Sequence, residues 1–269
     1  MGVYNFQSTA TFSVETDFFF GIDEFIFASQ MEDLDIGAKA KSVDGSGWGT
    51  DWSKKRPVVR DGEWKAKGHY CGDKGNISWL LNWRFGLKTP RHAWASLAGL
   101  SVGAPIHAMP CYIDDAGAKA SMNDSGKFEG GLLAAGACDM GYVMVSPYTT
   151  NVLTTTGTST PDDTSIYLPN GSNGGACYVF VNAIVGGTAP TIVPKVSHST
   201  DGVASYVDLT PVSPWGTILG ADSTTWVQYV EIPSTQTINP FVKIGWTTTG
   251  APTQVQALAI FARRPDRSK

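Results

Sequence analysis

The chain has 269 residues, of which 42% are hydrophobic and 16% charged, and it carries a formal net charge of −4. Its basic residues form no dense run beyond Lys54, Lys55 and Arg56, which argues against tight sequence-specific or wrapping nucleic-acid binding. The first residues lack the pattern of a secretory signal, and no apolar run reaches the roughly 18 residues of a membrane span. We therefore expect no membrane partner and folding in a cytosol.

Charge density and composition divide the chain into two parts. Residues 1–152 hold 14 basic and 17 acidic side chains, whereas residues 153–269 hold 6 and 7. Residues 153–163, with the sequence LTTTGTSTPDD, are small and polar, which is typical of a linker. We therefore predict two domains, 1–152 and 164–269, joined by this linker.

The first predicted elements are two aromatic-rich strands within residues 10–28. They are joined near Gly21, and acidic residues such as Glu15 and Asp23 lie among the aromatic ones. This composition favours an opening strand pair.

A glycine-rich segment with tryptophans follows, within residues 39–60. Gly45, Gly47 and Gly49 surround Trp48, but no strand is expected to lead into them and no helix follows promptly, so a dinucleotide cradle is disfavoured. A long loop that carries tryptophans is more typical of an interaction arm. We predict that this arm meets a partner surface.

The segment from Arg56 to Gly86 changes its hydrophobic period from two to about 3.6 residues, which predicts a strand followed by a helix. In the strand, Glu63, Lys65, Lys67 and His69 alternate with Trp64, Ala66, Gly68 and Tyr70, so one face is wet and the other dry. A helix is predicted at about 77–86, since Asn76 can cap it and Gly86 can end it. The wet face of the strand needs an aqueous surrounding.

Two further β segments are predicted in the first half. One lies around Ile106 to Ile113 and ends in a hairpin-like acidic turn at Asp114 and Asp115. The other covers residues 126–135. In it, Lys127 and Glu129 fall on the side opposite Phe128.

The second half contains well-separated, β-branched strand candidates. Asp201-Gly202 is a hairpin signal between two of them. Their spacing is typical of an antiparallel sandwich without long helices. The strand candidates are residues 176–183, 191–197, 226–232, 241–247 and 255–263. The fold class we predict is mainly β: a barrel-forming domain with one flanking helix, followed by an antiparallel β-sandwich.

No residue pattern supports catalysis. Asp61 and Glu63, or Asp114 and Asp115, cannot face each other across a cleft, as a glycosidase pair must, and no GxSxG motif occurs. His69, Cys71, His92, His107 and Cys138 have no dependable zinc-ligand spacing. Cys71, Cys111, Cys138 and Cys177 lack CxxC spacing, so we expect buried thiols. We expect no enzyme, no cofactor and no metal.

Three stretches resemble a known family. VVRDGEWKAKGHYCGDKG resembles a strand of the tail tube proteins of long-tailed, siphovirus-type bacteriophages, in which a single helix follows that strand. NDSGKFEGGLLAAGACDMGYVMVSP resembles the second tube strand of that family. HSTDGVASYVDL, INPFVKIGWTTTG and LAIFARR resemble the Ig-like β-sandwich that many members carry at the C-terminus, on the tube exterior.

This resemblance implies a structural virion protein, made in the host bacterial cytoplasm and located in the virion tail. Its subunits would close into hexameric rings, stacked into a tube through which viral DNA passes during ejection without specific binding. The partners that it implies are copies of the chain itself and other tail proteins: the tape measure, the tail terminator and the tail tip. Edge-to-edge closure also agrees with a strand pair that has one wet face and exposed edges.

The resemblance also implies roles for particular residues. The lumen-lining candidates are Glu63, Lys65, Lys67, His69, Lys127 and Glu129. An arm at about 39–60 would reach the next ring through Trp48, Trp52, Lys54, Lys55 and Arg56. Its acidic partners across the joint would be Glu32, Asp33 and Asp35.

A second interpretation stays open from the sequence. The chain would then be a virion surface or head-decoration protein whose C-terminal half binds a host glycan. That function needs an aromatic-lined groove, for which the candidates are Tyr167, Tyr178, Trp215 and Trp226.

Overall fold

The computed structural model describes residues 19–22, 31–44, 55–69, 89–121, 124–147, 152–159, 162–163, 173–222 and 226–264. Within these ranges the chain is almost entirely β, which confirms the predicted mainly-β class, and every strand pairing is antiparallel. The helix predicted at 77–86 lies outside the described residues. No helix in the described ranges is long and apolar enough to cross a membrane.

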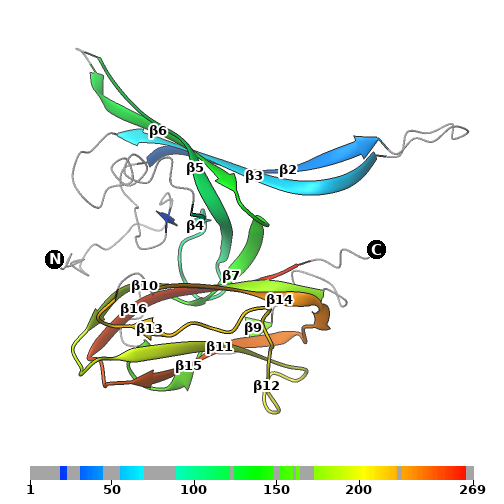
Figure 1. The fold of residues 1–269 in the computed structure, drawn as a ribbon, viewed down its shortest axis with the longest axis vertical. Helices are drawn as coiled ribbons and strands as arrows, with labels where there is room; N and C mark the ends of the chain where they lie inside the picture. Colours follow the sequence, from blue (N-terminus) through cyan, green and yellow to red (C-terminus); the bar gives the residue numbers. More distant parts are fainter. Residues whose placement is uncertain are drawn as a thin grey trace, which may run out of the picture.

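The larger of two sheets has ten strands and runs through both halves of the chain (Figure 1). Its main path is β14 (Val227–Thr237), β10 (Asn173–Val185), β16 (Gln254–Arg263), β7 (Asp139–Val145), β5 (Pro105–Ser121), β6 (Asp124–Ala134), β3 (Lys55–His69) and β2 (Met31–Asp44). Off this path, β4 (Arg91–Ser96) pairs with β5 and with β1 (Phe19–Ile22).

The smaller sheet has six strands, all from the second half. Its path is β12 (Val207–Asp208), β11 (Thr191–Ser199), β15 (Phe241–Thr249) and β8 (Gly157–Thr158), with β13 (Ile218–Leu219) on β11 and β9 (Asp162–Asp163) on β15. It lies against the part of the larger sheet formed by β14, β10 and β16 (Figure 1). A short 3-10 helix, η1 (Val152–Thr154), precedes it.

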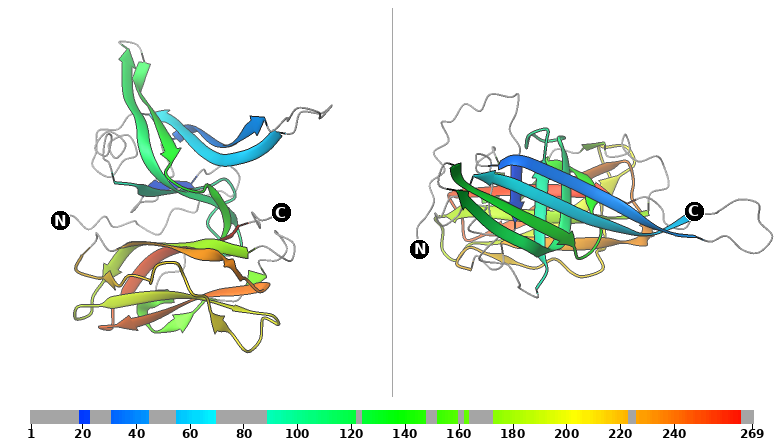
Figure 2. Two further views of the ribbon diagram at one scale, coloured as in Figure 1. Left: turned by 45° about the vertical axis from the view of Figure 1, so that its right-hand side comes forward. Right: turned by 90° about the horizontal axis from the view of Figure 1, so that it is seen from above.

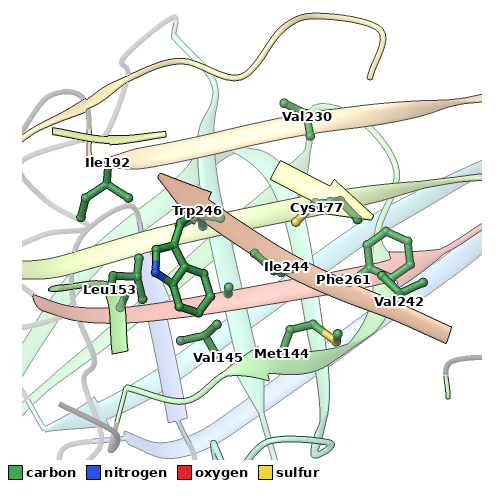
Figure 3. Packing of buried hydrophobic residues seen from close by; sticks show 14 of the residues in the cluster. Met144, Val145, Leu153, Cys177, Ile192, Val230, Val242, Ile244, Trp246 and Phe261 are labelled. Carbon is green, nitrogen blue, oxygen red and sulfur yellow. The ribbon is translucent and has the colours of Figure 1, made fainter. Parts of the chain in front are cut away.

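The two sheets share one hydrophobic core (Figure 3). Trp246 of β15 and Phe261 of β16 are buried in it, together with Cys177 of β10 and Met144 of β7. The Trp246 Nε1 atom donates a hydrogen bond of 2.8 Å to the Thr155 carbonyl oxygen, so the polar edge of the indole is satisfied. Burial of each large side chain contributes about 1.5–3 kcal/mol, which makes this core the main support of the second half.

The segment expected to act as a linker is instead built into the smaller sheet where the structure describes it. Leu153 is buried in the shared core, and β8 and β9 pair with β15. The Ser159 hydroxyl oxygen accepts a hydrogen bond of 3.0 Å from the Ile244 N–H. Small polar residues fit a sheet edge as well as a linker, so composition alone did not separate the two.

The strands expected in the second half are confirmed. Four of the five candidate segments fall within β10, β11, β15 and β16, and the fifth begins one residue before β14. The chain also reverses at the Asp201-Gly202 signal, since β11 is followed by β12, which pairs with it. Gly202 has a φ of +72°, and Asp201 Oδ1 accepts hydrogen bonds from the backbone of Val203 and Ala204.

The first half differs from expectation at three points. β5 runs through the predicted acidic turn, because a register shift between Ile113 and Asp115 bulges Asp114 and pairing with β6 continues beyond it. The strand β2 leads directly into the glycine-rich segment, so the arm begins and ends as paired strands. The described strand β1 pairs with β4, whereas the rest of the expected opening pair lies outside the described residues.

Candidate functional site

The candidate site is one face of a four-stranded ribbon that projects from the body of the molecule (Figures 1 and 2). We define the ribbon as β2, β3, β6 and the part of β5 from Cys111 to Ser121, which pairs with β6. Along β3, the predicted alternation is confirmed. Lys65, Lys67 and His69 are exposed and Glu63 is half-buried, whereas Trp64 and Ala66 are buried. The ribbon therefore has one wet and one dry face.

Strand register brings the charged side chains of three strands together. Lys67 of β3 stands opposite Glu129 of β6 and opposite Asp33 of β2. Lys65 stands opposite Asp35. We use the name charged face for the set of charged and histidine side chains that the structure describes on this wet surface: Asp33, Asp35, Glu63, Lys65, Lys67, His69, Lys127 and Glu129. All six residues expected from the sequence to line a lumen therefore share one face.

Charges of both signs are interleaved on this face. Lys65 Nζ lies 3.2 Å from Glu63 Oε1, and Lys67 Nζ lies 3.4 Å from Glu129 Oε1. The pKa of Lys65 is raised by the hydrogen bond and charge of Glu63, with smaller contributions from Asp35 and Glu129. Four carboxylates (Asp33, Asp35, Glu63, Glu129) and three ammonium groups (Lys65, Lys67, Lys127) give −4 + 3 = −1 with His69 neutral. The face is thus hydrophilic and close to neutral.

The dry face packs on a small hydrophobic cluster. Trp64 is fully buried there, and β4 supplies the facing side chains. The buried members are Trp64, Ala66, Ala93, Ala95, Met109, Cys111, Ile113, Phe128 and Leu132. Because the dry face is packed against this cluster, the opposite face of the ribbon is the one that meets water.

Two exposed apolar residues, which the sequence analysis did not identify, lie at one end of the charged face. Tyr112 of β5 and Leu133 of β6 are cross-strand partners, each 40% exposed, and Leu133 also stands opposite Glu63. The signal was present: continuing the period of two from Lys127 and Glu129 leads through Gly131 to Leu133. The wet face therefore has an apolar margin.

The residues assigned to the arm are only partly described. Lys55 and Arg56 begin β3, paired with Asp44 and Val43 of β2. Trp48, Trp52 and Lys54 lie outside the described residues. The acidic candidates Asp33 and Asp35 lie opposite Lys67 and Lys65 of the same subunit, and Glu32 sits at a register shift of β2. Contact of these acids with the arm of another subunit stays a prediction.

The described residues that were considered as metal ligands do not lie close together. In the described part of the chain, no group of three His, Cys, Asp or Glu side chains could hold a metal ion. Cys111 and Cys177 are buried, as expected, whereas Cys138 is half-buried. Cys71 lies outside the described residues.

The aromatic residues considered for glycan binding pack inside the protein where the structure describes them. Tyr178 is fully buried, so it cannot stack on a sugar. Trp215 and Trp226 are half-buried against the shared core, and Trp226 Nε1 donates a hydrogen bond of 2.9 Å to the Leu219 carbonyl oxygen. Tyr167 lies outside the described residues. The described members of the set thus serve packing.

Among known proteins, this chain shows only a remote similarity to solved structures. No protein-family profile matches the sequence, and no curated protein matches it. The chain is similar to a chain of the virion of a native gene transfer agent particle, with a TM-score of 0.37 and 16% identity, covering 44% of this chain and 92% of that one. It is similar to a chain of the sheath–tube complex of an extracellular contractile injection system in its extended state, with a TM-score of 0.36 and 12% identity, covering 53% and 100%. It is also similar to the Dit protein of SPP1, a hub protein of the adsorption apparatus of phages that infect Gram-positive bacteria, with a TM-score of 0.35 and 10% identity, covering 91% and 98%. Because every score is below 0.5, these similarities carry no argument about function.

Proposed function

We propose that this protein is a structural subunit of a siphovirus-type virion tail. Copies of it close into hexameric rings, which stack into a tube that conducts viral DNA during ejection. The observation that carries the proposal is the ribbon, which is dry on one face, charged on the other and open at two edges.

The open edges supply the means of self-association. Among the described strands, β2 pairs only with β3, and β5 beyond Cys111 pairs only with β6. Within the described part of the chain, the backbone N–H and C=O groups of both edges have no strand partner, which favours the addition of another strand. Copies joined edge to edge by a rotation close into a barrel, and closure removes the edges.

The charged face then looks into the bore. Interleaved carboxylates and ammonium groups keep the lining hydrated and near neutral, so the phosphates of passing DNA are neither bound tightly nor excluded. A strongly basic lining would retain DNA through counterion release. The mixed charge therefore suits a conduit.

The remaining parts take supporting roles in this proposal. The arm between β2 and β3 reaches the next ring, with Trp48 and Trp52 as anchors. The two packed sheets of the second half, with β8 and β9 included, form an Ig-like domain on the tube exterior. The tape measure, tail terminator and tail tip proteins meet the tube inside it and at its two ends.

Negative-stain microscopy of the concentrated protein tests the proposal, which expects rings or tubes. Hydrogen exchange adds residue-level detail. The amides of β2 (Met31–Asp44) and of residues 113–121 that point away from β3 and β6 should exchange fast in the monomer and become protected on assembly. Monodisperse monomers at high concentration, with both edges unprotected, would refute the proposal. Glycan binding by such monomers would favour a surface protein.

A further inference from the structure

The ribbon is joined to the rest of the molecule by a narrow part of the larger sheet. The pairing of β5 with β7 covers only the stretch from Pro105 opposite Tyr142 to Ala108 opposite Asp139. The pairing of β7 with β16 contains a register shift between Ala259 and Ile260. Short ladders and irregular register specify the angle between two parts of a sheet weakly. Buried apolar side chains such as Trp94 of β4, Ile106 of β5 and Ile260 of β16 also cross this joint, but apolar contacts are not directional and fix its angle less sharply than hydrogen bonds do.

A buried hydrogen-bonded network lies at this joint. Asp139, at the end of the β5–β7 ladder, is 5% exposed. It accepts a fork of hydrogen bonds from Arg264, with Nε to Oδ1 and one terminal guanidinium nitrogen to Oδ2, both at 2.8 Å. Tyr178 Oη of β10 donates a third hydrogen bond of 2.8 Å to Oδ2. The network thus joins β7, β10 and the residue that follows β16.

The same guanidinium group extends the network to β14. Its other terminal nitrogen donates a hydrogen bond of 2.8 Å to Glu231 Oε1, and the Tyr229 hydroxyl donates to the same carboxylate. The His92 ring of β4 lies 5.1 Å from the Tyr229 ring centroid and 6.2 Å from that of Tyr178. Side chains from both halves of the chain therefore converge here. We call Asp139, Tyr178, Tyr229, Glu231 and Arg264 the Asp139 clasp.

The clasp should contribute little to the free energy of folding, but it should fix the distance and angle between the strands that it joins. Replacing a buried ion pair by apolar side chains of similar size is often neutral or stabilising, since desolvation offsets much of the charge attraction. Forked hydrogen bonds nevertheless fix both distance and angle, because an arginine and a carboxylate pair in one plane. Burial raises the pKa of Tyr178, and the Asp139 charge raises it further, so the phenol stays a donor.

We propose that the Asp139 clasp sets the angle between the ribbon and the two packed sheets, and that edge-to-edge closure of the subunits depends on this angle. The second clause rests on the proposed function, whereas the first does not. Apolar residues at the same positions would keep the joint buried, but they would allow the ribbon to change its angle to the two packed sheets.

The test replaces the buried clasp by apolar groups in the full chain. The variant Tyr178→Phe/Asp139→Leu/Arg264→Met leaves Glu231 partly exposed to water and bonded to Tyr229, so no buried charge is stranded. Spin labels are introduced as noncanonical residues at Lys127 and Thr247, both exposed and on opposite sides of the joint. Electron–electron dipolar spectroscopy on the monomer then measures the distance distribution.

We expect a melting temperature within about 5 °C of the parent, a broader or shifted distance distribution, and loss of rings. A distribution that matches the parent overturns the proposal. The matched control is Lys195→Met/Asp208→Leu, which removes an exposed ion pair of 3.4 Å in the smaller sheet and should leave the distribution unchanged.

If the triple variant does not fold cooperatively, Arg264→Lys decides the question. Lysine keeps the charge but cannot make the fork, so the distribution should broaden while the fold is retained. An unchanged distribution for Arg264→Lys overturns the proposal. Should the parent protein form no rings, the proposed function fails, while the distance measurement still decides the role of the clasp.

Discussion

Lys67 and Glu129 stand directly opposite each other on β3 and β6, and their Nζ and Oε1 atoms lie 3.4 Å apart. Asp33 stands opposite Lys67 on its other side, so one row across three strands alternates in sign. Both side chains of the ion pair are nearly half exposed, and exposed pairs of this kind add little to stability. Their effect is to neutralise the surface locally, which is the property that the proposed DNA conduit requires.

Reversing two carboxylates should turn this surface into one that retains DNA. Glu63→Lys with Glu129→Lys changes the charge of the face from −1 to +3, because each substitution adds two units (−1 + 2 + 2). We expect tubes that still assemble but eject DNA more slowly. Each new phosphate contact should add about 0.9 to the slope of log binding constant against log salt.

The control for charge reversal is Glu63→Gln with Glu129→Gln, which gives a face charge of −1 + 1 + 1 = +1. It should slow ejection less than the lysine variant. Equal ejection rates and salt slopes for parent, glutamine and lysine proteins would remove these residues from the bore.

Shortening the arm should separate stacking from folding. Deletion of Ser42–Ser53 removes the end of β2 and the tryptophan-bearing segment, so we expect single rings with a cooperative melting transition and no tubes. Trp48→Ala/Trp52→Ala keeps the length and should shorten the tubes, since aromatic anchors carry much of an interface's affinity. If electron microscopy showed tubes of parental length for the deletion variant, the proposed role of the arm in ring stacking would be refuted.

The dry face of the ribbon should carry its stability. Trp64 is fully buried in the hydrophobic cluster under the dry face, so Trp64→Ala should lower the free energy of unfolding by about 3–5 kcal/mol in urea denaturation. Lys65→Ala, one residue away on the wet face, should cause no measurable change. If the two variants lost similar stability, the assignment of wet and dry faces would be wrong.

Much of the fold was predictable from period and composition. The alternation from Glu63 to His69 placed each side chain on its correct face, because a single buried side specifies strand register. The candidate strands of the second half were found for the same reason: each is β-branched and bounded by turn residues.

The features that sequence patterns did not predict depend on pairing with neighbouring strands. Asp114 and Asp115 have the composition of a turn, yet β6 extends the ladder past them and a bulge absorbs Asp114. The stem of the arm is rich in lysine and alanine, which are depleted in strands, but β3 pairs with it up to Asp44 opposite Lys55. The Asp139 clasp joins residues 125 positions apart, which no local pattern reveals.

Stability should fall as pH drops below neutrality because of His198. Its Nδ1 accepts a hydrogen bond of 2.9 Å from the Asn239 N–H, and burial, with the Arg263 charge, lowers the pKa of this histidine. A depressed pKa means that the unfolded chain binds the proton more readily, so the contribution is full above the unfolded-state pKa of about 6.5 and is lost as pH falls from there through the lower pKa of the folded state.

We expect protonation of His198 to cost about 0.5–1.5 kcal/mol, the value of the lost hydrogen bond. Urea denaturation at pH 7.5 and 5.5 measures it. His198→Gln, which cannot titrate, should be less stable than the parent at pH 7.5 but show a smaller drop at pH 5.5. An equal drop in both proteins would assign the pH dependence to other groups.

Helical reconstruction of assembled particles by electron cryomicroscopy tests the central claim most directly, because it locates both edges and both faces of the ribbon. The account predicts β2 hydrogen-bonded to a strand of a neighbouring copy, with Lys65 and Lys67 facing a water-filled bore. A reconstruction with those lysines on the outer surface, or with β2 unpaired between copies, would contradict it.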